Sequence, residues 1–174
     1  AALLEGAAMA RAAIDDGADV IALPSDVTEL DDMRLLAEEA AERFGEIDVW
    51  INNAGIGLVG PFADVPMASH RQVIETNLFG YVHGAKAAMR QFRAQGYGVL
   101  INNASMNAYV AEPFASAYVA SKFAVRGLAD SLREEWLDEP GIHICTVLPA
   151  VIDTPLFQHA ANYEGRAPRA MPPV

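Results

Sequence analysis

Hydrophobic and polar residues follow two different patterns of spacing along the chain. Short apolar runs of strand length occupy residues 19–23, 47–52, 98–103 and 143–148. Longer segments with apolar residues at helical spacing occupy residues 1–14, 28–44, 68–95 and 115–137. Because the apolar runs are unbroken and alternate with helices, they predict parallel strands that are covered on both faces. We therefore expect a single doubly wound α/β domain over residues 1–174.

The composition narrows the class of protein. The chain has 174 residues, of which 52% are hydrophobic and 20% charged, and it contains one cysteine. These values suit a domain with a sizeable core and exclude a disordered chain, a collagen-like repeat and a disulfide scaffold. No apolar run approaches the roughly 20 residues of a membrane helix, and no secretory signal opens the chain. We expect a cytoplasmic protein with no membrane partner.

Charge and ligand-forming residues argue against two further kinds of partner. Lys and Arg number 12 against 23 Asp and Glu, which gives a formal charge of −11. An acidic surface repels phosphate backbones, so we expect no nucleic-acid partner. The four histidines lack metal-ligand spacing, so we expect no metal. Cys145 lies inside an apolar run, and we expect it to be buried as a small hydrophobe.

A glycine motif follows one of the predicted strands. Residues 55–60, GIGLVG, match the G-x-G-x-x-G pattern of a dinucleotide-binding loop. Such a loop holds a pyrophosphate at the N-terminus of a helix that opens directly after it. Here Pro61 and Pro66 follow, and the helix begins only near Ala68. We interpret the motif as a flexible turn, with the phosphate loop as the less favoured alternative.

Three polar residues are candidates for chemistry. Ser105 directly follows the predicted strand 98–103, at the carboxyl end where open α/β sheets bind ligands. Tyr118 and Lys122 are four residues apart on the next helix and share a face. An ammonium about 4 Å from a phenol lowers its pKa by up to roughly three units, and a serine hydroxyl can hold a carbonyl or alcohol oxygen. The trio indicates carbonyl–alcohol interconversion with a hydride carrier, although on spacing alone a surface Tyr–Lys pair is the commoner alternative.

A larger set of motifs resembles the short-chain dehydrogenase/reductase family. The matching segments, in family order, are Asp26-Val27, Asn52-Asn53-Ala54-Gly55, Asn77, Asn102-Asn103-Ala104-Ser105, Tyr118-Val119-Ala120-Ser121-Lys122 and Pro149-Ala150-Val151-Ile152-Asp153-Thr154. The resemblance implies a Rossmann-like fold. It also implies an NAD(P)-dependent oxidoreductase that moves a hydride between the nicotinamide and a carbonyl or alcohol carbon of a small molecule.

The resemblance assigns the catalytic roles residue by residue. Tyr118 would be the general acid/base, and Lys122 would lower its pKa and hold the nicotinamide ribose. Ser105 would orient the substrate oxygen. Asn77 would hold a water that links Lys122 to solvent.

The resemblance also assigns the contacts to the cofactor, which is NAD or NADP. Asp26 and Val27 would flank the adenine, and Ala54 and Gly55 would pass close to the ribose and phosphate. Tyr118 and Lys122 would lie at the nicotinamide ribose, and Ile152 and Thr154 at the carboxamide. Asn52 and Asn53 are expected to pin neighbouring strands. Met106, Asn107 and Phe114 are candidates for the substrate pocket by their position alone.

Departures from the family pattern leave alternatives open. The family's first strand, its glycine-rich loop and its second strand have no counterpart here, so we expect the chain to lack the first βαβ unit and the C-terminal end. Ala150 replaces a family glycine, where a Cβ would crowd the cofactor if the backbone needs an unusual φ. A catalytically inactive binding or regulatory protein is one alternative, and an epimerase or dehydratase of the extended branch is another.

The two long helices give an expectation for the assembly. Residues 68–95 and 115–137 resemble the helices that the family uses for four-helix contacts between subunits. By that analogy we expect a homodimer or a homotetramer.

Overall fold

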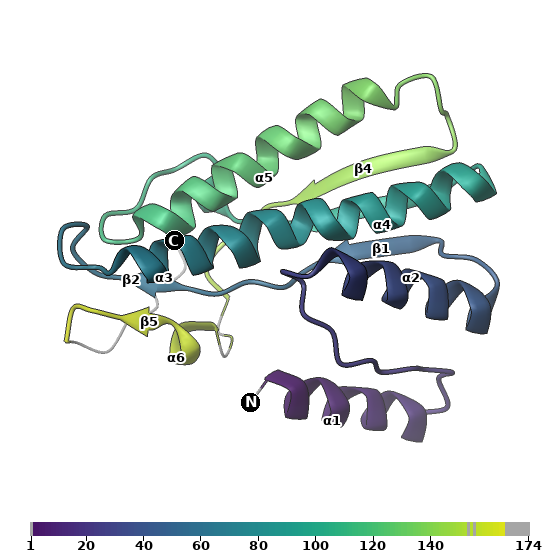
Figure 1. The fold of residues 1–174 in the computed structure, drawn as a ribbon, viewed down its shortest axis with the longest axis horizontal. Helices are drawn as coiled ribbons and strands as arrows, with labels where there is room; N and C mark the ends of the chain where they lie inside the picture. Colours follow the sequence, from purple (N-terminus) through teal and green to yellow (C-terminus); the bar gives the residue numbers. More distant parts are fainter. Residues whose placement is uncertain (1, 153, 155, 166–174) are drawn as a thin grey trace.

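The computed structural model describes residues 2–152, 154 and 156–165 (Figure 1). The helices are α1 (Ala2–Asp15), α2 (Leu30–Phe44), α3 (Met67–Ile74), α4 (Gly80–Gln95), α5 (Ser116–Glu135) and α6 (Leu156–His159). The strands are β1 (Val49–Asn52), β2 (Leu58–Val59), β3 (Gly98–Asn103), β4 (Ile142–Val147) and β5 (Ala161–Asn162). A π-helical segment, Glu75–Phe79, joins α3 to α4, and a 3₁₀ turn, Met106–Ala108, precedes α5. The predicted helices and all but one of the predicted strands are present, with small differences at their ends.

Three parallel strands form the main sheet, in the order β1-β3-β4. Val49 lies opposite Val99, and Gly98 lies opposite Ile142. A second, two-stranded sheet pairs β2 with β5, also in parallel. The carboxyl ends of the three main strands therefore meet at one edge of the sheet. This confirms the predicted parallel α/β architecture and places the segments with the candidate site residues side by side.

The predicted strand over residues 19–23 is wrong. This segment is an irregular connection between α1 and α2 (Figure 1). A strand needs a neighbour that takes its backbone hydrogen bonds. In the described part of the chain, the main sheet ends at β1, and no strand pairs with this segment. An apolar run alone therefore did not suffice to form a strand.

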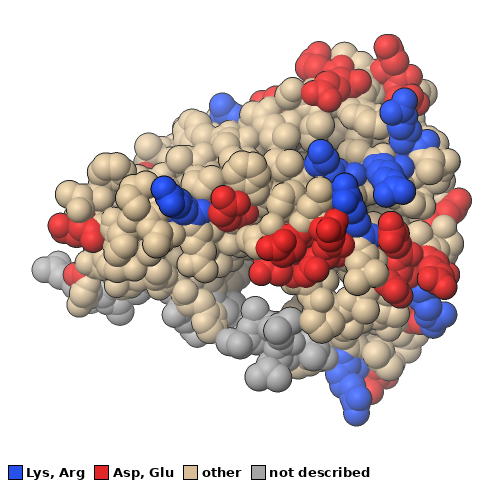
Figure 2. Space-filling model, in the orientation of Figure 1, with Lys and Arg blue, Asp and Glu red and all other residues tan. Residues whose placement is uncertain are grey.

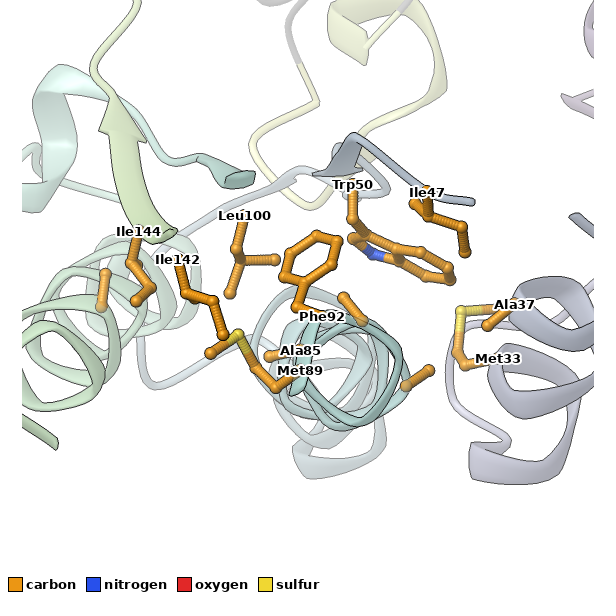
Figure 3. Packing of buried hydrophobic residues seen from close by; sticks show 13 residues of the cluster. Met33, Ala37, Ile47, Trp50, Ala85, Met89, Phe92, Leu100, Ile142 and Ile144 are labelled. Carbon is orange, nitrogen blue, oxygen red and sulfur yellow. The ribbon is translucent and has the colours of Figure 1, made fainter. Parts of the chain in front are cut away.

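The core lies where α2, α4 and α5 pack against one face of the sheet. Trp50, Leu100 and Ile144 come from the three main strands and belong to one cluster with Phe92 of α4, which lies between Trp50 and Leu100 (Figure 3). Phe92 and Leu100 are fully buried. Met33 extends this cluster towards α2 beside Trp50. Burial of apolar area, at about 25 cal/mol per Å², holds the helices on this face.

The other face of the sheet is open within the described residues. Ile51 is 58% exposed, and Cys145 is exposed as well. The expectation of a sheet covered on both faces is thus not met by the described part of the chain, and the expected burial of Cys145 is wrong. Side chains alternate along a strand with a period of two, which turns Ile144 into the core and Cys145 away from it.

The interpretation of residues 55–60 as a flexible turn holds only in part, because Leu58–Val59 within the motif form strand β2, paired with β5. The loop leads into β2, and the next helix, α3, begins only at Met67. The motif is therefore not followed directly by a helix, as a dinucleotide-binding loop requires.

Helix α4 approaches β1 very closely at Gly84. A Cβ at this position would lie 2.1 Å from Oδ1 of Asn52 and 2.9 Å from Nε1 of Trp50. The indole N–H of Trp50 donates to this Oδ1 at 2.9 Å. A residue without a side chain is needed for the helix to lie against this buried hydrogen bond.

Gly84→Ala is expected to lower the free energy of unfolding by about 2 to 3 kcal/mol, because the added Cβ overpacks the core and disturbs a buried hydrogen bond. Gly127→Ala, on α5, is the matched control, since nothing lies within 4 Å of its added Cβ. The control should raise stability by about 0.5 to 1 kcal/mol. Urea unfolding followed by circular dichroism measures both. Equal effects would contradict the close packing at Gly84.

Candidate active site

The end of β3 and the start of α5 bring Ser105, Tyr118 and Lys122 together. Ser105 caps the 3₁₀ turn, and its Oγ accepts a hydrogen bond from the N–H of Asn107 at 3.1 Å. The Ser105 hydroxyl is also near enough to the Tyr118 phenol to lower the pKa of that phenol. Nζ of Lys122 lies 5.6 Å from the centre of the Tyr118 ring. The structure therefore assembles the three residues that spacing alone had singled out.

The pKa of Tyr118 moves in the direction opposite to the sequence expectation. Burial raises this pKa, the interaction with the Ser105 hydroxyl lowers it, and the carboxylate of Glu112 raises it. Removing a phenolate from water is unfavourable, and here this effect outweighs the favourable contacts. The expected net lowering by Lys122 is therefore wrong for this structure, and Tyr118 rests as the protonated phenol at neutral pH.

Lys122 is a buried cation, with 4% of its surface exposed. Its Nζ donates to the carbonyl oxygen of Asn103 at 3.0 Å and to Oη of Tyr81 at 3.5 Å. None of the described carboxylates forms an ion pair with it. Burial consequently lowers the pKa of Lys122 to about 8. Neutral dipoles and ring faces hold this ammonium in place of a counter-charge.

Asn77 lies in the π-helical segment and is fully buried. Its Oδ1 accepts from the N–H of Ile56 at 2.8 Å, and its Nδ2 donates to the Ile56 carbonyl at 3.0 Å. The same Nδ2 donates to Oγ of Ser121, the neighbour of Lys122, at 3.3 Å. Asn77 thus fastens the loop after β1 to α5. The water expected at this residue stays a prediction.

Paired asparagines tie the strand ends together beneath the site. Nδ2 of Asn52 donates to Oδ1 of Asn102 at 2.9 Å, and Nδ2 of Asn103 donates to Oδ1 of Asn53 at 2.6 Å. These contacts cross from β1 to β3 at the same level of the sheet. They confirm the expectation that Asn52 and Asn53 pin neighbouring strands.

Tyr81 belongs to the site, although the sequence patterns missed it. The side chain is 1% exposed, and its hydroxyl donates to the Asn103 carbonyl oxygen at 2.7 Å. Burial raises the pKa of Tyr81, so the hydroxyl stays neutral. One signal pointed to it, because Tyr81 follows Asn77 by one helical turn and therefore shares its face.

The residues expected near the adenine and ribose lie at the edge of β1. The carboxylate of Asp26 accepts hydrogen bonds from the N–H and the hydroxyl of Thr28, at 2.9 and 2.8 Å, and these bonds lower its pKa. Val27 and Ala54 both line a cavity of about 190 Å³. A Cβ on Gly55 would lie 3.6 Å from Oδ1 of Asn77. The adenine contacts expected of Asp26 and Val27 stay a prediction.

The residues expected at the carboxamide follow β4. The N–H of Met106 donates to the Pro149 carbonyl at 3.0 Å, which joins the start of this segment to the Ser105 turn. Ile152 is 54% exposed and Thr154 is partly buried. Asp153, between them, lies outside the described residues. The segment passes the same edge of the sheet as the other candidates.

Within residues 2–152, 154 and 156–165, no group of three His, Cys, Asp or Glu side chains is arranged to hold a metal ion. No helix in that part of the chain is both long and apolar enough to cross a membrane. On the face shown in Figure 2, acidic and basic side chains are interspersed, and few lie over α3 and the start of α5.

Comparisons with known proteins match this geometry. The family model described as short chain dehydrogenase matches residues 3–164. A 1-deoxy-11-beta-hydroxypentalenate dehydrogenase from Streptomyces arenae is 39% identical over 167 residues, which cover 89% of this chain and 58% of that protein. This chain belongs to the short-chain dehydrogenase family. It spans about half the length of the curated relatives it matches.

Solved structures of the family share the fold. A short-chain dehydrogenase/reductase from Burkholderia phymatum, in complex with NAD, aligns with a TM-score of 0.85 and 26% identity over 88% of this chain and 56% of its own. A gluconate 5-dehydrogenase from Burkholderia cenocepacia J2315, in complex with NADP and tartrate, aligns with a TM-score of 0.80 and 31% identity over 86% and 58%. The expected Rossmann-like fold is confirmed.

Glu112→Gln is expected to lower the pKa of Tyr118, because it removes a carboxylate that raises it. Glu46→Gln is the matched control, since Glu46 accepts a hydrogen bond from Tyr97 and holds the pKa of that phenol at about 12. The control should lower the pKa of Tyr97 and leave Tyr118 unchanged. A ¹³C NMR titration of tyrosine-labelled protein follows both groups. A Tyr118 titration that is the same with and without Glu112 would show that the carboxylate does not act on the phenol.

Proposed function

We propose that this protein is an NAD(P)-dependent oxidoreductase that transfers a hydride between the nicotinamide and a carbonyl or alcohol carbon of a small molecule. One observation carries the proposal: the Tyr118 phenol lies near enough to the Ser105 hydroxyl for that hydroxyl to lower its pKa, and it is one helical turn from the buried ammonium of Lys122. A proton donor, a hydroxyl for the substrate oxygen and a cation are the groups this chemistry needs. Family members bound to NAD and to NADP support it.

Each member of the trio has a separate task in this proposal. The Ser105 hydrogen, which now points to Oδ1 of Asn107 at 3.2 Å, would be donated to the substrate oxygen instead. Tyr118 Oη gives a proton to that oxygen during reduction and takes one from it during oxidation. The Lys122 ammonium stabilises the phenolate that forms after the proton has left. The bound nicotinamide supplies or accepts the hydride at the substrate carbon.

The cofactor contacts proposed here follow the strand ends. Lys122 gives two N–H groups to the protein, and an ammonium has a third that can bind the nicotinamide ribose. The other contacts are Tyr118 at the nicotinamide ribose, Asp26 and Val27 at the adenine, Ala54 and Gly55 along the ribose and phosphate, and Ile152 and Thr154 at the carboxamide. Either NAD or NADP suits this set.

The cellular location and the class of substrate are also proposals. An acidic composition and a single cysteine favour the reducing cytoplasm. The net charge of −11 favours small-molecule substrates over nucleic acid.

We further propose a homodimer or homotetramer that assembles through α4 and α5. A cavity of about 580 Å³ opens between these helices, with the apolar side chains of Met89, Leu128 and Trp136 in its lining. An apolar groove on the surface is a common place for another chain to bind. Light scattering at micromolar concentration should show the oligomer, and a monomer would contradict it.

Tyr118→Phe is expected to lower kcat by about 10² to 10⁴, since it removes the group that exchanges a proton with the substrate. Binding of NADH or NADPH should change little. Tyr109→Phe is the control, because Tyr109 is 61% exposed and its ring stacks on Arg126 at 4.1 Å. A full rate in Tyr118→Phe would contradict the proposed role. Cofactor binding without any turnover in the unmodified protein would favour the inactive relative.

A further inference from the structure

A buried hydroxyl lies beside the Lys122 ammonium, and the mechanism above does not use it. Tyr81 is in the first turn of α4 with 1% of its surface exposed. Its hydroxyl donates to the Asn103 carbonyl oxygen at 2.7 Å, and Nζ of Lys122 donates to the same oxygen at 3.0 Å. Nζ lies 3.5 Å from Oη of Tyr81. The ammonium, the hydroxyl and the carbonyl therefore form a closed triangle.

The chemistry of these groups fixes the direction of each hydrogen bond. A carbonyl only accepts and an ammonium only donates. The single hydrogen of the Tyr81 hydroxyl goes to Asn103, so its lone pairs remain to accept from Lys122. Tyr81 is thus an acceptor for the cation, and the triangle orients two of the three N–H groups of Lys122.

The ammonium has few other favourable contacts. The titratable groups that face it are Tyr81 from α4 and Tyr118 from α5, and Glu112 acts on Tyr118. Lys122 forms no ion pair with any carboxylate of the described residues. The Tyr81 ring adds a second contact, with Nζ at 5.1 Å from its centre. Loss of one acceptor is costly for a buried charge that has no counter-charge.

We propose that Tyr81 is a positioning residue of this site: its hydroxyl keeps Lys122 charged and holds the ammonium beside Tyr118. The consequence for catalysis rests on the proposed function. The contact itself can be tested on the protein without any turnover.

Tyr81→Phe removes the hydroxyl and keeps the ring. The chain contains two lysines, Lys86 and Lys122, so labelling lysine Cε with ¹³C gives two resonances to follow against pH. The pKa of Lys122 is about 8 in the unmodified protein, and in Tyr81→Phe it should be about one pH unit lower. The signal of the exposed Lys86 should be the same in both. An unchanged Lys122 titration would overturn the proposal.

Tyr97→Phe is the matched control, because it also loses the hydrogen bond of a phenol, here to Glu46. It should leave the Lys122 titration unchanged. A change as large as that in Tyr81→Phe would reflect a general loosening of the fold and would overturn a specific role for Tyr81.

A second measurement follows the Tyr81 resonance in the unmodified protein. Burial keeps Tyr81 itself protonated, so its ¹³Cζ resonance should respond only as Lys122 titrates, with a midpoint of about 8. A Tyr81 resonance that does not respond at this midpoint would overturn the proposal even if Tyr81→Phe fails to fold.

Measuring the rate of alcohol oxidation against pH distinguishes the role of Tyr81 from the proposed function. A less charged Lys122 stabilises the Tyr118 phenolate less, so the pKa of Tyr118 rises. In Tyr81→Phe, alcohol oxidation should therefore lose about tenfold in kcat near neutral pH, and its rising limb should move to higher pH, with KM little changed. If the Lys122 pKa falls in Tyr81→Phe but the unmodified protein shows no turnover, only the proposed function is contradicted. Turnover with an unchanged pH profile in Tyr81→Phe would contradict the role of Tyr81 alone.

Discussion

The geometry of the site depends on a buried ammonium that has no counter-charge among the described residues. Taking a cation out of water costs several kcal/mol even after the protein relaxes. Around Lys122 this cost is offset by the Asn103 carbonyl, the Tyr81 hydroxyl and the faces of two tyrosine rings. Hydrogen bonds to charged groups contribute about 1.5 to 3 kcal/mol each, so these contacts offset only part of the cost. A lysine pKa of about 8 is the result.

The Asn103 carbonyl, the last of β3, is free to accept from two helices. The N–H of Ala104 still pairs with the Val147 carbonyl of β4 at 2.9 Å, while the carbonyl of Asn103 accepts from α4 and α5. The paired asparagines hold β1 level with β3, and the missing side chain at Gly84 lets α4 lie against β1. The distances between the reactive groups therefore depend on packing that lies some way from the proposed chemistry.

The sequence located most of the fold because the period of apolar positions is a local property of a helix or a strand. It failed for residues 19–23 and for Cys145, since both depend on what lies beside a strand. The trio of Ser105, Tyr118 and Lys122 was found from spacing. The direction of the Tyr118 pKa was missed because burial is not visible in spacing, and Tyr81 was missed because its contact to Asn103 spans 22 residues.

We propose that this edge of the sheet binds a nicotinamide dinucleotide beside Tyr118. Fluorescence titration of the protein with NADH and with NADPH tests it most directly, with Lys122→Ala measured in parallel. The unmodified protein should bind at least one of the two, and Lys122→Ala should weaken this binding by about tenfold or more through loss of a charge-assisted hydrogen bond. A folded protein that binds neither would contradict the claim.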